Sequence, residues 1–303
     1  MTCFSREIPT FVTDKQRKHT MILIADSGST KTDWCGLKGE TCLRLQTGGI
    51  NPVLQKSDDI VKQLYRELLP QLPIEPIEAI YFYGAGCTPL WSKTLRACLT
   101  KVFGEQTRSE VQSDMLGAAR ALCGKQAGIV CILGTGSNSC YYDGQQIALH
   151  TPALGYILGD EGSGAYLGRQ LLNSVLKELL PAHICITFAN ETQLTQEEII
   201  HKVYRRPLAN RFLAGFTPFL KKYEDEPAIH RLLTDAFKEF ITRNLHAYPA
   251  DKPVFAVGSI AHYFQTEFTE ALQSAGYQAA VIAQSPMEGL IRYHQPVSET
   301  KAP

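Results

Sequence analysis

The stretch that decides the fold reads MILIADSGSTKTDW, at residues 21–34. An apolar strand runs into the carboxylate of Asp26, then into a short loop of small and hydroxyl-bearing residues, and then into a second strand. Backbone N–H groups and hydroxyls of such a loop can close on phosphate oxygens. The carboxylate at the strand end is in a position to hold a metal ion, directly or through water.

A second loop of the same kind follows the apolar run 129–133. It reads GTGSN at residues 134–138 and leads into another strand at 139–142. Either loop alone could be a plain hairpin turn, since Gly and Ser are common in turns. Two copies, aligned here with Gly28 on Gly136, favour phosphate binding and predict two duplicated α/β domains facing each other across a cleft.

Composition excludes several functional classes. The chain has 303 residues, of which 44% are hydrophobic, enough for one large domain or two ordinary ones. Lys plus Arg equals Asp plus Glu, 30 against 30, so no global charge draws the chain to nucleic acid or an anionic membrane. No apolar run approaches the roughly 20 residues of a membrane helix. Residues 1–20 lack the apolar centre of a secretory signal, and we expect a poorly ordered extension, with Met21 an alternative start.

The cysteines indicate a compartment. There are nine, an odd number, and none forms a Cys-x-x-Cys pair. Without a secretory signal, this usage predicts reduced thiols in a cytoplasmic protein, most of them small core residues.

The order of predicted elements is that of an α/β protein. Strands are expected at 21–26, 32–37, 41–46, 79–83, 129–133, 139–142, 254–257 and near 278–283. Helices are expected after an N-cap at Ser57, at 91–103, from 113 to 122, in broken pieces over 162–248, and at 286–294. Gly84-Ala85-Gly86 predicts a tight strand-to-helix turn. The predicted boundaries are an extension 1–20, a first domain 21–112 completed by a C-terminal helix of about 286–303, and a second domain 113–285.

Two further acidic sites stand out. Asp114 opens a helix after a short polar segment, where it could serve only as a first-turn acid favoured by the helix dipole. The segment GDEGSG at 159–164 embeds two acids among glycines just before a helix. That composition suits a ligand loop, although helix capping remains an alternative. The chain has neither a P-loop nor a dinucleotide-binding glycine pattern after a strand.

Three motifs together carry a family resemblance. Residues 26–32, 134–138 and 159–163 resemble, in order and spacing, the motifs of N-acetylglucosamine kinases, within the superfamily of sugar kinases, hexokinase, actin and heat-shock chaperones. The resemblance runs from about Met21 to about His294. It implies two duplicated ribonuclease H-like (actin-like ATPase) domains around a central cleft. It also implies ATP and Mg²⁺ as cofactors and ATP-dependent phosphorylation of an amino sugar, with N-acetylglucosamine giving its 6-phosphate as the first candidate.

The resemblance implies a role for each matching residue. Asp114 would be the catalytic aspartate and would also bind the sugar, and Asp26 would hold Mg²⁺. Phosphoryl transfer to a hydroxyl needs such a carboxylate together with charge neutralisation at the phosphates. The ATP-binding residues would be Gly28, Ser29, Thr30, Lys31, Gly134, Thr135, Gly136, Ser137, Ala214, Gly258 and Ser259. The sugar-binding residues would be Asn51, Gly155, Tyr156 and Asp160.

One departure from the family pattern concerns the sugar. Leu154 stands where the family has an aromatic residue before the Gly-Asp-Glu-Gly segment, and Tyr156 could compensate. The expected partner is therefore a small-molecule sugar of open identity, without nucleic acid or membrane, and with a homodimer left open. The alternatives are an activase ATPase of the benzoyl-CoA and hydroxyacyl-CoA reductase group, which needs cluster-binding cysteines, and a non-catalytic sugar sensor.

Overall fold

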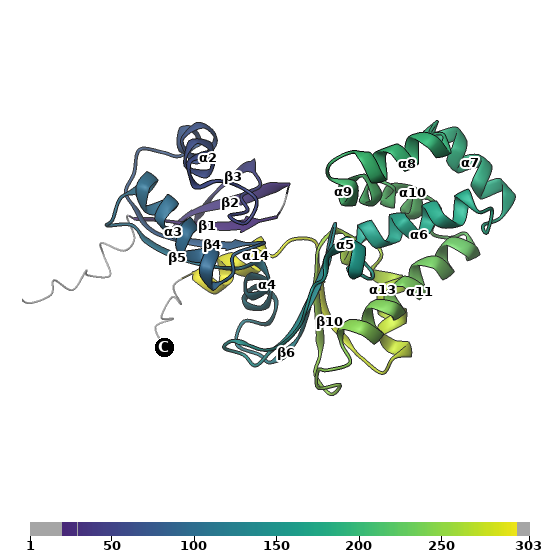
Figure 1. The fold of residues 1–303 in the computed structure, drawn as a ribbon. Helices are drawn as coiled ribbons and strands as arrows, with labels where there is room; N and C mark the ends of the chain where they lie inside the picture. The colour runs from purple at the N-terminus through teal and green to yellow at the C-terminus, as the bar shows by residue number, and fades with distance from the viewer. Residues whose placement is uncertain (1–19, 29, 296–303) are drawn as a thin grey trace, which may run out of the picture. The chain divides into compact units, whose positions relative to one another are not determined.

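The computed structural model describes residues 20–28 and 30–295 (Figure 1). The predicted extension 1–20 therefore lies outside the described residues except for Thr20, and so does the predicted phosphate-loop residue Ser29. Contacts divide the chain into two compact units, described here one at a time. The first runs to Asp114 and takes in the segment from His294, and the second is Met115–Tyr293.

The first unit is built on a five-stranded sheet in the order β3-β2-β1-β4-β5. The strands are β1 (Met21–Ser27), β2 (Lys31–Lys38), β3 (Thr41–Gly48), β4 (Ile77–Gly84) and β5 (Arg108–Ser113). β1 pairs antiparallel with β2 and β2 with β3, while β1, β4 and β5 are parallel. Helix α2 (Ser57–Gln63), the short turns η1 (Leu64–Leu68) and η2 (Leu69–Gln71), and helix α3 (Pro89–Phe103) complete the unit.

The core of the first unit forms where the sheet meets these helices. Trp34 on β2 is 1% exposed, and its ring makes an edge contact with Phe82 of β4 at 5.8 Å between centroids. The indole Nε1–H donates to Thr47 Oγ1 at 3.0 Å, so the buried polar atom is satisfied. The neighbouring Leu23, Ile80 and Leu95 are fully buried, as the apolar strands predict.

The second unit contains a second five-stranded sheet, ordered β10-β9-β6-β7-β8. Its strands are β6 (Gly128–Leu133), β7 (Ser137–Tyr142), β8 (Ile147–Thr151), β9 (Val254–Val257) and β10 (Ala279–Ala283). Taken from the other end, this order matches the first sheet strand for strand, with the same two antiparallel and two parallel pairings. The predicted duplication of an α/β sheet is confirmed.

The duplication has a different register from the one expected. Gly28 N–H donates to Lys31 O at 3.0 Å, and in the second hairpin Gly134 N–H donates to Gly136 O, also at 3.0 Å. Gly28 therefore corresponds to Gly134, and the alignment of Gly28 with Gly136 was wrong. The second loop is one residue shorter, and β7 begins at Ser137, the counterpart of Thr32.

Helices make up most of the rest of the second unit. They are α4 (Asp114–Cys123), α5 (Gly155–Leu158), α6 (Gly164–Leu176), α7 (Ala182–Thr192), α8 (Gln196–Arg205), α9 (Ala209–Ala214), α10 (Thr217–Lys222), α11 (Pro227–Asn244), α12 (Ser259–Tyr263), α13 (Gln265–Ser274) and α14 (Met287–His294). The first residue of α4 and the last residue of α14 belong to the first unit. Their core is rich in phenylalanine, with Phe237 and Phe268 in edge contact at 5.4 Å between α11 and α13.

The local predictions are confirmed only in part. Strands β5 and β8 were not expected from the sequence, and Ser57 is the first residue of α2 rather than its N-cap, which is Lys56. Gly84-Ala85-Gly86 forms the predicted strand-to-helix turn, in which Cys87 N–H donates to Gly84 O at 3.2 Å. The domain boundaries predicted from the sequence remain a prediction. The two units defined by contacts differ from them chiefly in that α14 up to Tyr293 is grouped with the second unit.

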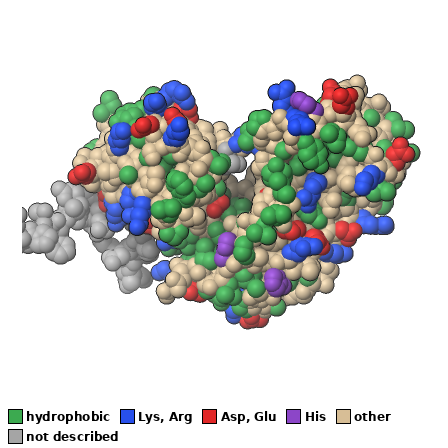
Figure 2. Space-filling model, in the orientation of Figure 1, with side chains coloured by type: hydrophobic (Ala, Val, Ile, Leu, Met, Phe, Trp, Pro, Cys, Tyr) green, Lys and Arg blue, Asp and Glu red, His purple; other side chains and the backbone are tan. Residues whose placement is uncertain are grey.

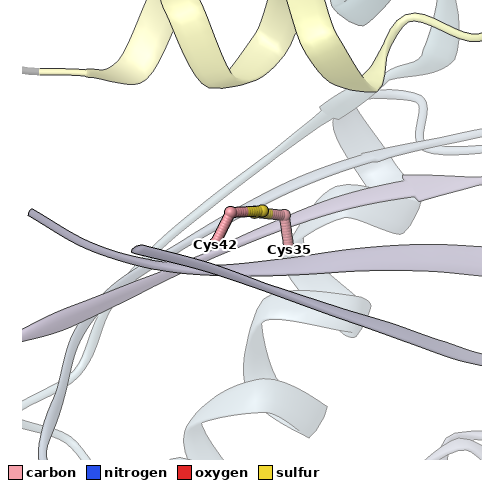
Figure 3. Close-up of a disulfide and its surroundings, with 2 residues drawn as sticks. All are labelled: Cys35 and Cys42. Carbon is pink, nitrogen blue, oxygen red and sulfur yellow. A yellow bond between two sulfur atoms is a disulfide. The ribbon is translucent and has the colours of Figure 1, made fainter. Parts of the chain in front are cut away.

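The expectation that all cysteines are reduced was wrong for one pair. Cys35 of β2 and Cys42 of β3 form a disulfide, with 6.1 Å between their Cα atoms (Figure 3). Strand register explains the pairing. Cys35 lies opposite Arg44 and Cys42 opposite Leu37, so the two cysteines are diagonal neighbours on the same face of adjacent antiparallel strands. The cysteines 87, 98, 123, 131 and 140 are free and buried, in line with small core residues.

Charge on the surface is mixed. On the face drawn in Figure 2, Lys and Arg side chains are interspersed with Asp and Glu in both units. This agrees with the equal numbers of basic and acidic residues in the chain. Within residues 20–28 and 30–295, no helix combines the length and apolar character needed to span a bilayer.

Close packing of α6 against α9 gives the first prediction. A Cβ added to Gly168 of α6 would overlap the Leu213 carbonyl of α9. Ala is the better helix former by about 1 kcal/mol, so propensity alone would make Gly168→Ala stabilising. We expect the overlap to prevail and to destabilise the protein by about 1–3 kcal/mol.

Thermal unfolding would measure this effect. Asn173→Ala, at an exposed position of the same helix, is the matched control and should shift the midpoint little. A Gly168→Ala protein as stable as the parent would contradict the packing of α6 on α9.

Candidate functional site

Two carboxylates meet at one edge of the first sheet. β1, β4 and β5 are parallel neighbours, so their carboxyl ends lie side by side, a common ligand-binding position in α/β proteins. Asp26 lies near the end of β1, opposite Tyr83 of β4, and Asp114 follows the last residue of β5. The two acids are close enough for the charge of Asp114 to act on Asp26.

Asp26 is an unusual carboxyl group. Burial, reinforced by the charges of Asp114 and Asp33 and opposed by Lys31, raises its pKa from 3.8 to about 7. Asp33 lies directly opposite Asp26 in the β1–β2 register. Two neighbouring acids and partial burial disfavour the ionised form, and a divalent cation beside Asp26 would restore it.

The first loop is a tight hairpin whose tip is exposed. Gly28 and Thr30 are exposed, and Thr30 O accepts a hydrogen bond from Gly49 N–H at 3.1 Å. Lys31, predicted to contact phosphate, forms an ion pair with Asp33 at 2.9 Å, and its side chain is 58% exposed. An exposed pair of this kind is weak, so an incoming anion could recruit Lys31 at little cost.

Two buried hydroxyls, which the sequence did not single out, hold this loop in place. Ser27 Oγ and Thr32 Oγ1 lie 2.7 Å apart across the hairpin, and both residues are fully buried. Ile50 N–H donates to Ser27 Oγ at 3.0 Å, and Thr32 Oγ1 donates to Gly48 O at 3.1 Å. The hairpin is thereby tied to the segment that leads to Asn51.

Asn51 lies beside the turn that follows β4. Its Oδ1 accepts the N–H of Val53 at 3.0 Å, and the same oxygen occupies the space that a Cβ on Gly86 would need. Gly86 also has φ of +79°, so only glycine fits there. Because β4 lies between β1 and β5, Asn51 is brought to the same sheet edge as Asp26 and Asp114.

The second loop is organised around the start of α6. Gly164 N–H donates to Gly134 O at 2.8 Å, and Ala165 N–H donates to Thr135 O at 3.0 Å. The loop carbonyls thus satisfy two N–H groups that a helix N-terminus leaves open. Within the described residues, the N–H groups of Thr135 and Gly136 donate to no protein acceptor, so they are available to an anion.

The second hairpin lacks the acids of the first. In the β6–β7 register Ile132 lies opposite Asn138, at the positions that Asp26 and Asp33 hold in the first sheet. Equivalent strands therefore present two carboxylates in one copy and none in the other. The first hairpin suits a cation, and the second suits an anion.

Asp160 lies on the second loop. Its Oδ1 accepts Ser137 N–H at 3.3 Å, and its Oδ2 is 2.9 Å from the place of a Cβ on Gly136. Burial raises the pKa of Asp160, while the hydrogen bond from Ser137 lowers it. The sequence predicted a sugar-binding role for Asp160, and contact with the second loop was not expected.

The predicted nucleotide residues gather around the same loop. Gly258, with φ of +122° at the end of β9, has no room for a Cβ because of Leu133 O. Ala214, at the end of α9, packs closely on Gly164: its Cβ is 3.1 Å from the position that a Cβ added to Gly164 would take. Ser259 begins α12 directly after Gly258. The structure thus brings Ala214, Gly258 and the second loop together within the second unit.

The remaining predicted sugar residues lie on α5. Arg169 donates to Tyr156 O at 3.2 Å, and Gly159 N–H donates to Gly155 O at 2.8 Å. Leu154, the residue that departs from the family pattern, is 58% exposed. Residues 154–156 therefore lie just before Asp160, with Leu154 available for contact.

The raised pKa of Asp26 predicts a pH dependence of stability. Between about pH 4 and 7 the folded chain holds a proton that the unfolded chain has lost, so stability falls as pH rises through this window. The slope from this group approaches about 1.4 kcal/mol per pH unit. Asp26→Asn should remove it and make the variant more stable than the parent above pH 7.

Unfolding midpoints measured from pH 5 to 8 without divalent cations would test this prediction. Other buried acids also contribute, so the informative quantity is the difference between variant and parent at each pH. Asp33→Asn is the control for charge, and it should lower the upper end of this pH window only partly, because burial is the larger cause of the raised pKa. Parallel curves for Asp26→Asn and the parent would refute the assignment.

The chain is similar to a protein of known structure. No family profile matches it, and no curated protein sequence does. It is similar to a crystal structure from Porphyromonas gingivalis, a protein provisionally named N-acetylglucosamine kinase, with 48% identity and a TM-score of 0.87 over 91% of this chain and 99% of the other.

Two more distant structures share the fold. One, from Chromobacterium violaceum, also provisionally named N-acetylglucosamine kinase, is 18% identical with a TM-score of 0.69, over 91% of this chain and 99% of that one. A glucokinase of the ROK family from Streptomyces griseus, in complex with glucose and AMPPNP, is 12% identical with a TM-score of 0.53, over 90% and 97%. On the strength of the P. gingivalis relative, this chain, with its two-sheet α/β fold, belongs to the N-acetylglucosamine kinase family.

Proposed function

We propose that the protein is an ATP-dependent sugar kinase that phosphorylates a hydroxyl of an amino sugar. N-acetylglucosamine, converted to its 6-phosphate, is the first candidate substrate. The observation that carries the proposal is the pair of acids at the carboxyl edge of the first sheet, Asp26 with its raised pKa and Asp114 beside it. The P. gingivalis relative, with its provisional kinase name, supports the same activity.

Asp114 would act on the sugar. In the transfer, the sugar hydroxyl oxygen forms a bond to the γ-phosphorus of ATP, the bond from that phosphorus to ADP breaks, and the hydroxyl proton passes to Asp114. A carboxylate in this role orients the hydroxyl and accepts the proton late. Asn51, held at the same edge beside Gly86, would contact the sugar through its amide.

Asp26 would hold the magnesium ion. Its carboxylate fits this role because burial and two neighbouring acids destabilise the ionised form, which a bound cation would stabilise. Within the described residues no three His, Cys, Asp or Glu side chains are arranged to hold a metal. Mg²⁺ is commonly held by one or two carboxylates together with substrate phosphates, and it would neutralise phosphate charge during transfer.

The second unit would contribute to ATP binding. The free N–H groups of Thr135 and Gly136 are suited to phosphate oxygens, and the loop that bears them carries no acid of its own. Gly258, Ser259 and Ala214, gathered beside this loop, would contact the rest of the nucleotide. Tyr156 and the exposed Leu154 would contribute to the choice of sugar.

A coupled assay of ADP release tests the activity. The panel should contain N-acetylglucosamine, N-acetylmannosamine, glucosamine and glucose, with the phosphorylated position identified by NMR. We expect N-acetylglucosamine to raise ADP release well above the sugar-free rate. If no sugar in the panel does so, the proposal is wrong.

Asp114→Asn tests the catalytic assignment. Loss of a general base lowers turnover by about 10²–10⁴-fold, and we expect kcat to fall within this range while ATP affinity changes little. Asp59→Asn, at an exposed position in the first turn of α2, is the matched control and should keep full activity. A fully active Asp114→Asn protein would remove Asp114 from its role.

A further inference from the structure

The second loop is in contact with the carboxylate of Asp160. Asp160 Oδ1 accepts Ser137 N–H at 3.3 Å, and Oδ2 lies against Gly136. A carboxylate oxygen on a backbone N–H makes the same kind of contact that a phosphate oxygen would make. The Asp160 carboxylate and an ATP phosphate therefore compete for this loop, and their negative charges repel each other.

This acid reaches the loop from another segment. The positions equivalent to the acids of the first hairpin are Ile132 and Asn138, so the second hairpin itself is neutral there. Asp160 is 23 residues from Ser137 in the chain. Its effect on the loop can therefore be changed without rebuilding the hairpin.

A hydrogen bond holds the main chain at Asp160 in place. Asp160 O accepts Ser163 N–H at 3.1 Å, just ahead of α6. Its backbone has φ of +56°, a conformation that Asp and Asn tolerate better than most residues. With the main chain held in this way, the carboxylate would leave the loop by rotation of its side chain.

We propose that Asp160 is a positioning residue that couples sugar binding to nucleotide binding. Without sugar, its carboxylate occupies the second loop and weakens the binding of ATP. Sugar hydroxyls draw the carboxylate away and free the Ser137 N–H and the space beside Gly136 for phosphate. This inference rests on the proposed function, and it assigns a regulation to the same site: ATP binds tightly only when the acceptor sugar is present.

The test measures binding of Mg²⁺–AMPPNP to the full chain by calorimetry, with and without N-acetylglucosamine. Coupling energies between ligands commonly correspond to 5–150-fold in affinity. We expect the sugar to tighten AMPPNP binding to the parent by about tenfold. Asp160→Asn keeps the shape and the tolerance for positive φ but removes the charge. It should bind AMPPNP about tenfold more tightly than the parent without sugar, and gain nothing further when sugar is added.

Two further variants sharpen the test. Asp160→Gly removes the whole side chain and accepts the positive φ without strain, so it should repeat the sugar-free gain if Asp160→Asn folds poorly. Glu161→Gln is the matched control at the next acid, whose side chain accepts a hydrogen bond from Asn244 and whose charge is a lesser influence on Asp160 than burial; it should change AMPPNP binding far less than Asp160→Asn does.

The outcomes separate the two proposals. If the parent binds AMPPNP and neither Asp160 variant binds it more tightly without sugar, the carboxylate only supports the loop, and the coupling is overturned. The sugar-free comparison does not depend on which sugar is the substrate. If the parent binds no AMPPNP with or without sugar, the proposed kinase function fails, and the coupling fails with it.

Discussion

The buried pair of hydroxyls at Ser27 and Thr32 is the constraint on which the first unit depends. The two oxygens, 2.7 Å apart, join the ends of β1 and β2 and also bind the backbone at Gly48 and Ile50. A buried polar pair must be fully satisfied, so three chain segments are fixed relative to one another. Asp26 precedes this junction and Asn51 follows it, which is why groups from distant parts of the sequence lie at one sheet edge.

The two sheets share one topology, but one hairpin suits a cation and the other suits an anion. Both contain a hairpin whose loop begins with glycine, closed by the same backbone hydrogen bond. In the first, two carboxylates face each other across the hairpin, and burial makes the ionised form of Asp26 costly. In the second, Ile132 and Asn138 replace them, and the start of α6 orders the loop through its carbonyls, leaving N–H groups open. The difference lies in a few side chains and not in the backbone.

Much of this arrangement could be predicted from the sequence, and the omissions have physical causes. The hairpin at 21–34, the second loop and the turn at 84–86 have strong local signals, because each apolar run ends at a glycine or within three residues of one. Strand β5 was missed because Val111 is its one fully buried residue, and β8 because most of its side chains are exposed at the sheet edge. Neither has the apolar pattern that identifies a strand.

Other features depend on tertiary structure and could not be found in the sequence. The Cys35–Cys42 pair follows from strand register, the pKa of Asp26 from burial, and the position of Asp160 from the way α6 begins. The equivalence of Gly28 with Gly134 likewise needed the hydrogen bonds, because the two loops differ in length by one residue. Whether the residues predicted to bind ATP and sugar do so remains a prediction.

The exchange of Asp26 and Asp33 for Ile132 and Asn138 has an evolutionary consequence. If both sheets descend from one ancestral gene segment, an early homodimer of that segment would have placed identical hairpins on both partners, each forced to serve cation and anion alike. Fusion of two copies into one chain would lift that restriction, because each hairpin could then mutate independently. The difference between the two hairpins is one that identical subunits cannot have.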